Sequence, residues 1–389
     1  MRFALSTEQV DFATELRKIL DAAKVPGIAR AWADGDFVPG RALLRSIADM
    51  GVFGLIVDEE HGGAGATAVD LVVALVELGR AGVPGPIVES AAAIPALLQH
   101  LSPVDEATLS RIADGSTLAT IAFAYPSTTA GVRDQTATPT LAANGHAGAT
   151  PSLEPGRPAQ TKPALALDSG AADLVLHATQ RAVGVGLTTR ADNDGDTTGA
   201  SPGNVSRAIV GDAVTSVDAT RKLTRVEPGE VLADDADAID YSFDVGVLGC
   251  AAQLLGAGRA MLDQSVAYAK ARKQFGRPIG EFQAVKQQLA DALIGLDLAE
   301  PLLYRAALTL DTADRARDVS AAIVACGDAA HRAARTALQV HGAIGYTAEC
   351  DLSLWLTKTT ALRTAWGTPD FHRARIATAL RNTPPDRPA

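Results

Sequence analysis

The spacing of apolar residues divides this chain into two helical blocks with a block of short strands between them. In residues 1–115, runs such as "AVDLVVALVELGRAG" place apolar side chains at steps of three and four, as in an amphipathic helix. In residues 116–240 the apolar runs are short and rich in Thr and Val, which favours strands. Helical spacing returns in residues 241–389. The sequence therefore predicts an α+β fold: an N-terminal helical domain, a middle β domain and a C-terminal helical domain.

Local signals support the helices. Ser6 and Gln9 stand at the spacing of a capping box, which predicts a helix start. In the third block, one stripe of residues at steps of three and four is expected to be buried, and Pro301 is expected to kink the same helix. The stripe consists of Phe282, Val285, Leu289, Leu293 and Leu296.

Composition restricts the function classes. The formal net charge of −10 disfavours nucleic acid and anionic membrane surfaces, since both require clustered Lys and Arg. We read no export signal in "MRFALSTEQVDF" and no membrane span, so we expect a cytoplasmic protein. Cys250, Cys326 and Cys350 form no CxxC pair, so we expect free, buried thiols and no metal site.

Two motifs in the third block carry the strongest signal. The first is "ARKQFGRPIGEFQAVKQQLAD" and the second is "ALQVHGAIGYTAECDLSLWL". Together with "GVFGLIVDEEHGGAGA" near the N-terminus, they resemble the acyl-CoA dehydrogenase family over essentially the whole chain. The resemblance implies a β domain between two helical domains, with FAD bound where two subunits meet.

The same resemblance implies which residues bind FAD. An arginine can place its planar guanidinium against a pyrophosphate while an aromatic ring lies along the cofactor. Small residues in a turn let backbone amides approach the phosphates, although an alanine stands where the family has a glycine. The residues carried over to the ADP half of FAD are Arg272, Gln274, Phe275, Gln339, Gly342, Ala343 and Gly345.

The catalytic base of the family is missing from both of its usual positions. The family removes an α-proton from an acyl thioester with a glutamate while a hydride leaves for the flavin, so a carboxylate near the substrate is essential. One family position, before a Gly-Thr pair, is Trp366 in "RTAWGTPDFHR". The other, twenty-six residues before Arg272, is Gly246. We therefore assign no catalytic residue; Asp244 is the one weak alternative, and we interpret it as the N-cap of a helix.

The flavin-ring contacts also depart from the family pattern. Ala124 and Tyr125 in "AFAYPSTTAGVRD" stand where the family has Thr and Glu. The ADP-side motifs are thus kept, while the base and the ring contacts are lost. By resemblance, this is the pattern of the non-catalytic subunit in heteromeric α2β2 acyl-CoA dehydrogenases of actinobacteria, which act on steroid-derived CoA thioesters. The implied partners are an acyl-CoA substrate and a homologous subunit that carries the catalytic glutamate.

Two other interpretations stay open at this point. One is a self-sufficient homo-oligomeric flavin dehydrogenase or oxidase that uses Asp244 or another carboxylate. The other is a non-enzymatic structural or acyl-CoA-binding protein that kept the fold. His341 is given no catalytic role, and His372 is expected at the surface or in an interface. The acyl group, the exact oligomer and the identity of the partner do not follow from the sequence.

Overall fold

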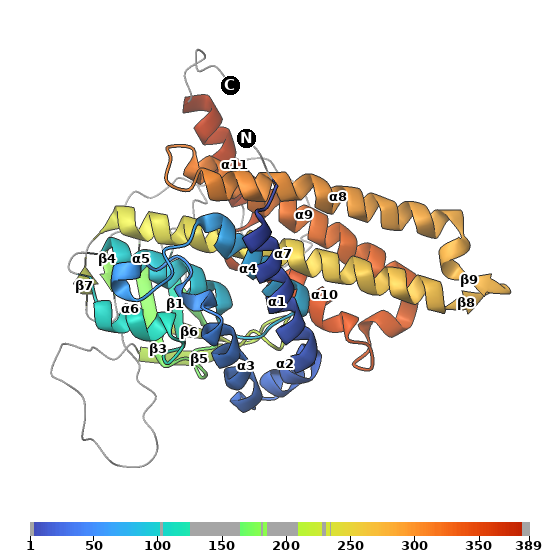
Figure 1. Ribbon diagram of the computed structural model, residues 1–389, viewed down its shortest axis with the longest axis horizontal. Helices are drawn as coiled ribbons and strands as arrows, with labels where there is room; N and C mark the ends of the chain where they lie inside the picture. The colour runs from blue at the N-terminus through green and yellow to red at the C-terminus, as the bar shows by residue number, and fades with distance from the viewer. Residues whose placement is uncertain are drawn as a thin grey trace, which may run out of the picture.

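The computed structural model shows helices, then strands, then helices along the chain, which confirms the predicted fold class (Figure 1). The structure describes seven stretches: residues 4–101, 104–124, 164–179, 182–184, 209–227, 231–233 and 235–382. The proposed domain boundaries at about 115 and 240 stay a prediction, although α7 begins at Ala236, before the second boundary.

The first helical part begins at the predicted capping box. The Ser6 hydroxyl accepts a hydrogen bond from the Gln9 amide at 3.2 Å, and the Gln9 side chain accepts one from the Ser6 amide at 3.0 Å. This confirms the predicted helix start. The helices are α1 (Thr7–Ala23), α2 (Val25–Ala33), α3 (Val38–Asp49), α4 (Ala68–Ala81), the π-helix η3 (Glu89–Ala93), α5 (Ile94–His100) and α6 (Glu106–Ala113).

The described strands of the middle part form two small sheets. The first has the order β1-β3-β4-β7, with β1 and β3 parallel and Ala119 opposite Leu174. The second has the order β2-β6-β5 and is antiparallel. The strands are β1 (Ala119–Ala124), β2 (Ala164–Leu167), β3 (Leu174–Thr179), β4 (Ala182–Gly184), β5 (Ile209–Val214), β6 (Leu223–Glu227) and β7 (Val231–Ala233).

The third part is built around one long central helix. It contains α7 (Ala236–Ala271), the short hairpin β8 (Lys273–Gln274) and β9 (Arg277–Pro278), α8 (Gln283–Leu308), α9 (Arg315–His341), α10 (Leu352–Ala365) and α11 (Pro369–Asn382). By length and composition α7 resembles a membrane span, but 94% of its most apolar window is buried inside the protein. It is therefore the core helix that joins α4, α8 and α9 (Figure 1).

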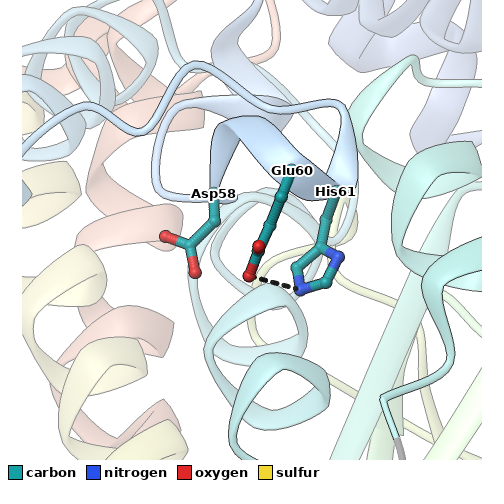
Figure 2. A group of neighbouring side chains, drawn as sticks. All are labelled: Asp58, Glu60 and His61. Carbon is teal, nitrogen blue, oxygen red and sulfur yellow. Dashed lines mark ion pairs between the residues drawn. The ribbon is translucent and has the colours of Figure 1, made fainter.

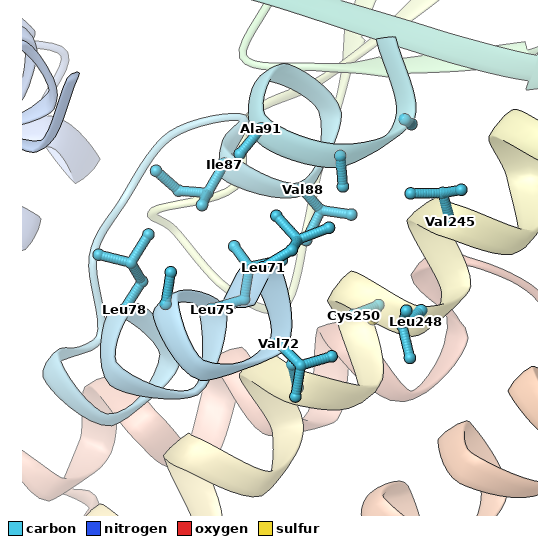
Figure 3. Packing of buried hydrophobic residues seen from close by; sticks show 14 of the residues in the cluster. Leu71, Val72, Leu75, Leu78, Ile87, Val88, Ala91, Val245, Leu248 and Cys250 are labelled. Carbon is cyan, nitrogen blue, oxygen red and sulfur yellow. The ribbon is translucent and has the colours of Figure 1, made fainter. Parts of the chain in front are cut away.

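Glycines bring α4 and α7 into close contact. A Cβ atom on Gly256 would lie 1.9 Å from the Val76 carbonyl oxygen, and one on Gly79 would lie 2.3 Å from the Gln253 carbonyl oxygen. Figure 3 shows how α4, η3 and α7 fill the space beside this contact with Leu, Val and Ile side chains. Because interiors are packed without voids, this contact fixes the first helical part against the third.

Three expectations about single residues were wrong. Asp244 is not an N-cap, because α7 begins more than two turns earlier and Asp235 caps it by accepting a hydrogen bond from the Ala238 amide. Leu293 is 47% exposed, because α8 buries the face that carries Leu296, Ala299 and Leu303 instead. His372, on α11, is 1% exposed, because its ring contacts Ser320 of α9 and the Trp366 carbonyl. The expectation for the thiols is confirmed for Cys250 and Cys326, which are buried and unpaired, whereas Cys350 is half-buried.

Candidate functional site

The first predicted cofactor motif lies at the end of α7, where the chain leaves the helix bundle. Arg272 follows the last residue of α7, and Gln274 and Phe275 form the β8–β9 hairpin. Phe275 has φ of +52° and is 92% exposed, and Gly276 has φ of +79° with open space around it. An aromatic ring held outward in a left-handed turn costs free energy unless something covers it. The hairpin therefore presents Phe275 to a group outside the bundle.

The second predicted cofactor motif lies at the end of α9. Gln339 is exposed on the last turn of α9, and Gly342 and Ala343 are exposed in the 3-10 turn η5 (Gly342–Tyr346). Gly342 has φ of +65° and ψ of −147°, and a Cβ there would meet no other atom within 4 Å. The free space beside Gly342 leaves its backbone accessible to a ligand. Gly345, by contrast, is buried, and a Cβ there would lie 3.0 Å from the His341 Cβ.

The structure brings the two motifs together. The rings of Tyr268, on the last turn of α7, and His341, at the end of α9, stack with their centroids 4.3 Å apart. His341 is thus a packing residue, as expected. We call the set Arg272, Gln274, Phe275, Gln339, Gly342, Ala343 and Gly345 the nucleotide-binding edge. A cation, an exposed ring and open backbone at a glycine turn fit the pyrophosphate and adenosine of a flavin nucleotide.

The two base positions contact each other in the core. Trp366 is 4% exposed, and its six-membered ring lies directly on Gly246 of α7. A Cβ on Gly246 would lie 2.2 Å from Trp366 Cζ3, which is far inside van der Waals contact. Trp366 therefore fits only because residue 246 has no side chain. Neither position offers a carboxylate, and the volume between them is filled.

Three phenylalanines surround Trp366, and sequence reasoning missed them. The centroid of Phe123, on β1, lies 5.4 Å from that of Trp366, and the centroid of Phe243, on α7, lies 6.0 Å from it. Phe371, on α11, packs edge-on against Phe243 at 6.1 Å. We call Phe123, Phe243, Trp366 and Phe371 the aromatic cluster. Aromatic pairs at these separations stabilise beyond their burial, so the cluster is a packed core.

His372 fixes the backbone of Trp366. Its Nε2 lies 2.8 Å from the Trp366 carbonyl oxygen and donates to it, while Nδ1 lies 3.2 Å from the Ser320 hydroxyl and accepts from it. Gly367, with φ of +103°, lets the chain turn tightly against this ring. A neutral imidazole with its proton on Nε2 satisfies both contacts, and burial favours this neutral form.

The neutral state of His372 predicts a pH dependence of stability. Burial lowers the pKa of His372 to about 4; the bond to Trp366 opposes the shift and Arg375 adds to it. Because the unfolded chain then binds more protons, stability is full above about pH 6.5 and falls by roughly 3 kcal/mol toward pH 4. The difference in free energy of unfolding between wild type and His372→Gln, from denaturant titrations across this range, should shrink on acidification. A difference that stays constant with pH would contradict a buried neutral ring.

Asp244 is held by two arginines. It is 1% exposed; Arg315 Nε lies 3.1 Å from its Oδ2 and Arg375 Nη1 lies 2.8 Å from its Oδ1. Arg375 also lies over the rings of Phe243 and Phe371, with its guanidinium carbon 5.8 Å from each centroid. Arginines therefore lie against both carboxylate oxygens, and the side chain is enclosed. The contacts of Asp244 are therefore structural.

An open groove of about 570 Å³ lies between the end of α5, the start of α7 and the loop before α9. Tyr241 donates to Asp311 at 2.9 Å and packs against His100, with ring centroids 4.1 Å apart. The groove is also lined by Asp235, Asp237 and Arg315. With three carboxylates against one arginine, the groove is unfavourable for phosphate groups.

A small acidic group lies on the 3-10 turn η2 (Glu59–His61), shown in Figure 2. The ligand atoms of Asp58, Glu60 and His61 lie within 4.8 Å of one another, and His61 Nε2 is 3.6 Å from Glu60 Oε1. Asp58 and Glu60 are exposed, so the group is compatible with a solvated ion pair. We assign no metal to it.

Of the two residues that stand where the family has Thr and Glu, Ala124 and Tyr125, only the first is described. Ala124 ends β1, and Tyr125 with the rest of its motif lies outside the described residues.

Two family models match the chain. The model for the acyl-CoA dehydrogenase N-terminal domain matches residues 6–116, and the model for the acyl-CoA dehydrogenase C-terminal domain matches residues 236–381. The second match contains the nucleotide-binding edge and both base positions.

Known proteins similar to the chain include the acyl-CoA dehydrogenase IpdE2 of Mycobacterium tuberculosis (strain ATCC 25618 / H37Rv), 29% identical over 86% of this chain and 85% of that protein. The probable acyl-CoA dehydrogenase YngJ of Bacillus subtilis (strain 168) is 34% identical over 40% of this chain, and the match spans 42% of that protein.

Solved structures share the fold. The ChsE4-ChsE5 complex from Mycobacterium tuberculosis contains a chain with a TM-score of 0.74 and 24% identity, covering 99% of this chain and 100% of that one. A variant of the Tcur3481-Tcur3483 steroid ACAD gives a TM-score of 0.72 with 18% identity, covering 96% of this chain and 98% of that one.

Proposed function

The chain belongs to the acyl-CoA dehydrogenase family, and we propose that it is the subunit of a heteromeric enzyme that completes its partner's FAD site without supplying a catalytic base. FAD is the cofactor of this family. In this proposal the partner is a homologous subunit that carries the glutamate.

One observation carries the proposal: Trp366 and Gly246, the two family base positions, pack on each other with no room for a side chain. The volume where a carboxylate would meet the thioester is occupied by the aromatic cluster. A chain with this core has no carboxylate at either position to remove an α-proton.

The nucleotide-binding edge supports the second half of the proposal. Phe275 is 92% exposed and Arg272 has an exposed side chain next to it, both facing away from the core. The aromatic cluster lies elsewhere, around the middle of α7, whereas the edge follows the end of α7. Residues that project outward in this way suit a flavin that is held mainly by another subunit.

The division of chemistry follows from these positions. Bound FAD supplies the hydride acceptor for the dehydrogenation. Arg272 neutralises the pyrophosphate, Phe275 covers the nucleotide, and the turn at Gly342 donates backbone hydrogen bonds. The aromatic cluster excludes water and substrate from this chain's own base positions. Proton removal from the thioester is left to the partner's glutamate.

The substrate is proposed to be an acyl-CoA thioester bound by the complex, with the acyl part in the partner. The acidic groove beside Tyr241 disfavours CoA phosphates on this chain. A steroid-derived acyl group is our proposal on the strength of the Tcur3481-Tcur3483 steroid ACAD, which shares the fold. A heterotetramer in the cytoplasm is part of the same proposal.

The two competing functions fit the contacts less well. A self-sufficient enzyme would need Asp244 or another carboxylate as its base, but Asp244 is 1% exposed and is enclosed by Arg315 and Arg375. A purely structural protein gives no reason for an exposed aromatic ring in a left-handed turn beside an arginine. These alternatives make opposite predictions for variants of Asp244 and Arg272.

The nucleotide-binding edge can be tested with Arg272→Ala in the co-purified complex. Losing a charge-assisted contact to phosphate costs about 1.5–3 kcal/mol, so FAD should dissociate roughly 10- to 100-fold more readily. Bound FAD is measured by visible absorption after dialysis. Arg381→Ala, at the exposed end of α11, is the control and should retain FAD. Equal FAD content in both variants would favour the purely structural protein.

A further inference from the structure

Five charged side chains are buried where the three parts of the chain meet. Glu89 comes from η3, Asp168, Asp218 and Arg221 come from turns of the middle part, and Lys358 comes from α10. Each is at most 8% exposed. We call these five residues the junction cluster. Buried charges cost free energy unless they are paired. The stability of the contact between the three parts therefore depends on how these charges are paired.

Lys358 touches all three parts. Its Nζ donates to the Val83 carbonyl oxygen of the first helical part at 3.2 Å, and lies 4.0 Å from Asp218 Oδ2 of the middle part. It is carried by α10 of the third part. Burial lowers the pKa of Lys358, while Asp218, Asp168 and Glu89 raise it. The ammonium group thus depends on these carboxylates to stay charged.

The carboxylates of the middle part face this lysine with unsatisfied oxygens. Asp218 Oδ1 accepts from the Thr220 amide and hydroxyl at 2.9 and 2.7 Å, and Asp168 Oδ1 accepts from the Lys222 amide at 3.0 Å. The Oδ2 atoms of both are buried and accept no hydrogen bond from any described residue. They rely on electrostatic attraction to Lys358 and Arg221.

The cluster has three carboxylates for two cations. Glu89 is 4% exposed, and it forms no ion pair with a described cation. Burial raises the pKa of Glu89, although Arg221 and Lys358 oppose the shift. Burial also raises the pKa of Asp168, to about 6, so Asp168 is mostly ionised at neutral pH.

The remaining groups near the cluster do not change this balance. Burial raises the pKa of the Cys250 thiol on α7, so it stays neutral. The Lys222 ammonium donates to the Ala33 carbonyl oxygen at 2.8 Å, on the other side of its turn. With one proton on a carboxylate, the charges of the cluster balance.

We propose that the junction cluster is a proton-dependent contact that holds the middle part against both helical parts, with the proton on Glu89. In this state Asp168 and Asp218 balance Arg221 and Lys358, and the three parts are held firmly. Ionisation of Glu89 leaves one buried negative charge in excess and loosens the junction. The contact is separate from the nucleotide-binding edge and the aromatic cluster, and it does not depend on the function proposed for them.

A matched pair of glutamines tests where the proton lies. Glu77, on α4, is also buried, but it forms a bidentate ion pair with Arg17 at 2.8 and 2.6 Å. Glu77→Gln should therefore lower the melting temperature of the full chain at pH 7 by roughly 5 °C. Glu89→Gln, which imitates the protonated form, should stay within about 2 °C of wild type, and should lose the fall in melting temperature that begins as the pH rises above 4.5, where Glu89 ionises in the unfolded chain. If Glu89→Gln lowers the melting temperature at pH 7 as much as Glu77→Gln does, the proposal is overturned.

Removing the shared cation tests the contact itself. Lys358→Met should lower the melting temperature by roughly 10 °C, since it leaves Asp168 and Asp218 with Arg221 as the one remaining cation of the junction cluster. Hydrogen exchange should rise in β2 and β6 before it rises in α4 and α7. Lys18→Met, which removes an exposed lysine, is the control and should change neither quantity. If Lys358→Met and Lys18→Met have the same melting temperature and the same hydrogen exchange, the proposal is overturned. If Lys358→Met yields no folded chain, the comparison of Glu89→Gln with Glu77→Gln tests the proposal instead.

Discussion

In the purified complex, replacing the partner's glutamate by glutamine is expected to lower the turnover rate by at least about 100-fold, because a positioned base contributes this much or more. Asp244→Asn in this chain is expected to leave the turnover rate per intact complex within about twofold. The reason is geometric: Asp244 is enclosed by Arg315 and Arg375 at 3.1 and 2.8 Å and is 1% exposed. Turnover is measured with an acyl-CoA substrate and an artificial electron acceptor.

The free energy of unfolding of Asp244→Asn must be measured together with its turnover rate. Removing the buried charge of Asp244 leaves two arginines without their partner, which costs about 3–5 kcal/mol. The rate is therefore normalised to bound FAD, and Arg375→Lys serves as a variant that weakens the same ion pair without touching the carboxylate. If Asp244→Asn abolishes turnover while FAD stays bound, the chain carries its own base and the heteromeric proposal is wrong.

Gly246→Ala is expected to lower the free energy of unfolding by about 2 kcal/mol. Alanine ordinarily stabilises a helix relative to glycine by about 0.5–1 kcal/mol, so this sign is informative. The added methyl group would lie 2.2 Å from Trp366 Cζ3, the indole ring packs against Phe123 and Phe243, and His372 holds the Trp366 backbone carbonyl. Overpacking of such a core costs about 1–3 kcal/mol. The measurement is a urea titration.

Two further variants make this prediction specific. Gly295→Ala on α8 is the matched control, because its Cβ would meet only the Ala329 Cβ at 3.9 Å, and it should stabilise or be neutral. Trp366→Leu should destabilise alone, but the double variant Gly246→Ala/Trp366→Leu should cost less than the sum of the two. Strict additivity would show that residues 246 and 366 do not compete for the same volume.

The order of helices and strands followed from the sequence, because periodicity reports which face of each element is buried. The loss of both base positions was also visible, since each lies at a fixed spacing from a motif. Their mutual contact was not, because Gly246 and Trp366 are 120 residues apart in the chain. Their contact follows only from the packing of α10, and of the turn after it, against α7. There Gly246, which has no side chain, makes room for the ring of Trp366.

The wrong predictions have physical causes in the local sequence. Five aspartates precede or begin α7 between residues 234 and 244, and any of them suits an N-cap. In the structure the N-cap is Asp235, and the helix after it buries Ala238 and Ile239 in its first turn. On α8, Leu293 was misassigned because the buried face includes four alanines beside Leu296, Leu303 and Tyr304, and a search for large apolar residues passes over alanines.

The placement of His372 shows a further limit. Its neighbours in "DFHRAR" are mostly polar, which favours a surface position. The ring is buried because it can donate to the Trp366 carbonyl and accept from Ser320, and such long-range partners leave no trace in the local pattern. The predicted FAD residues lie at the ends of α7 and α9 or just after them, and their role stays a prediction.

The most direct test of the division of labour is the visible absorption and dehydrogenase activity of the chain purified alone and after co-purification with its glutamate-bearing partner. The proposal predicts little flavin and no activity for the chain alone, and a flavin spectrum that is bleached by substrate for the complex. A yellow, active homo-oligomer of this chain alone would contradict it.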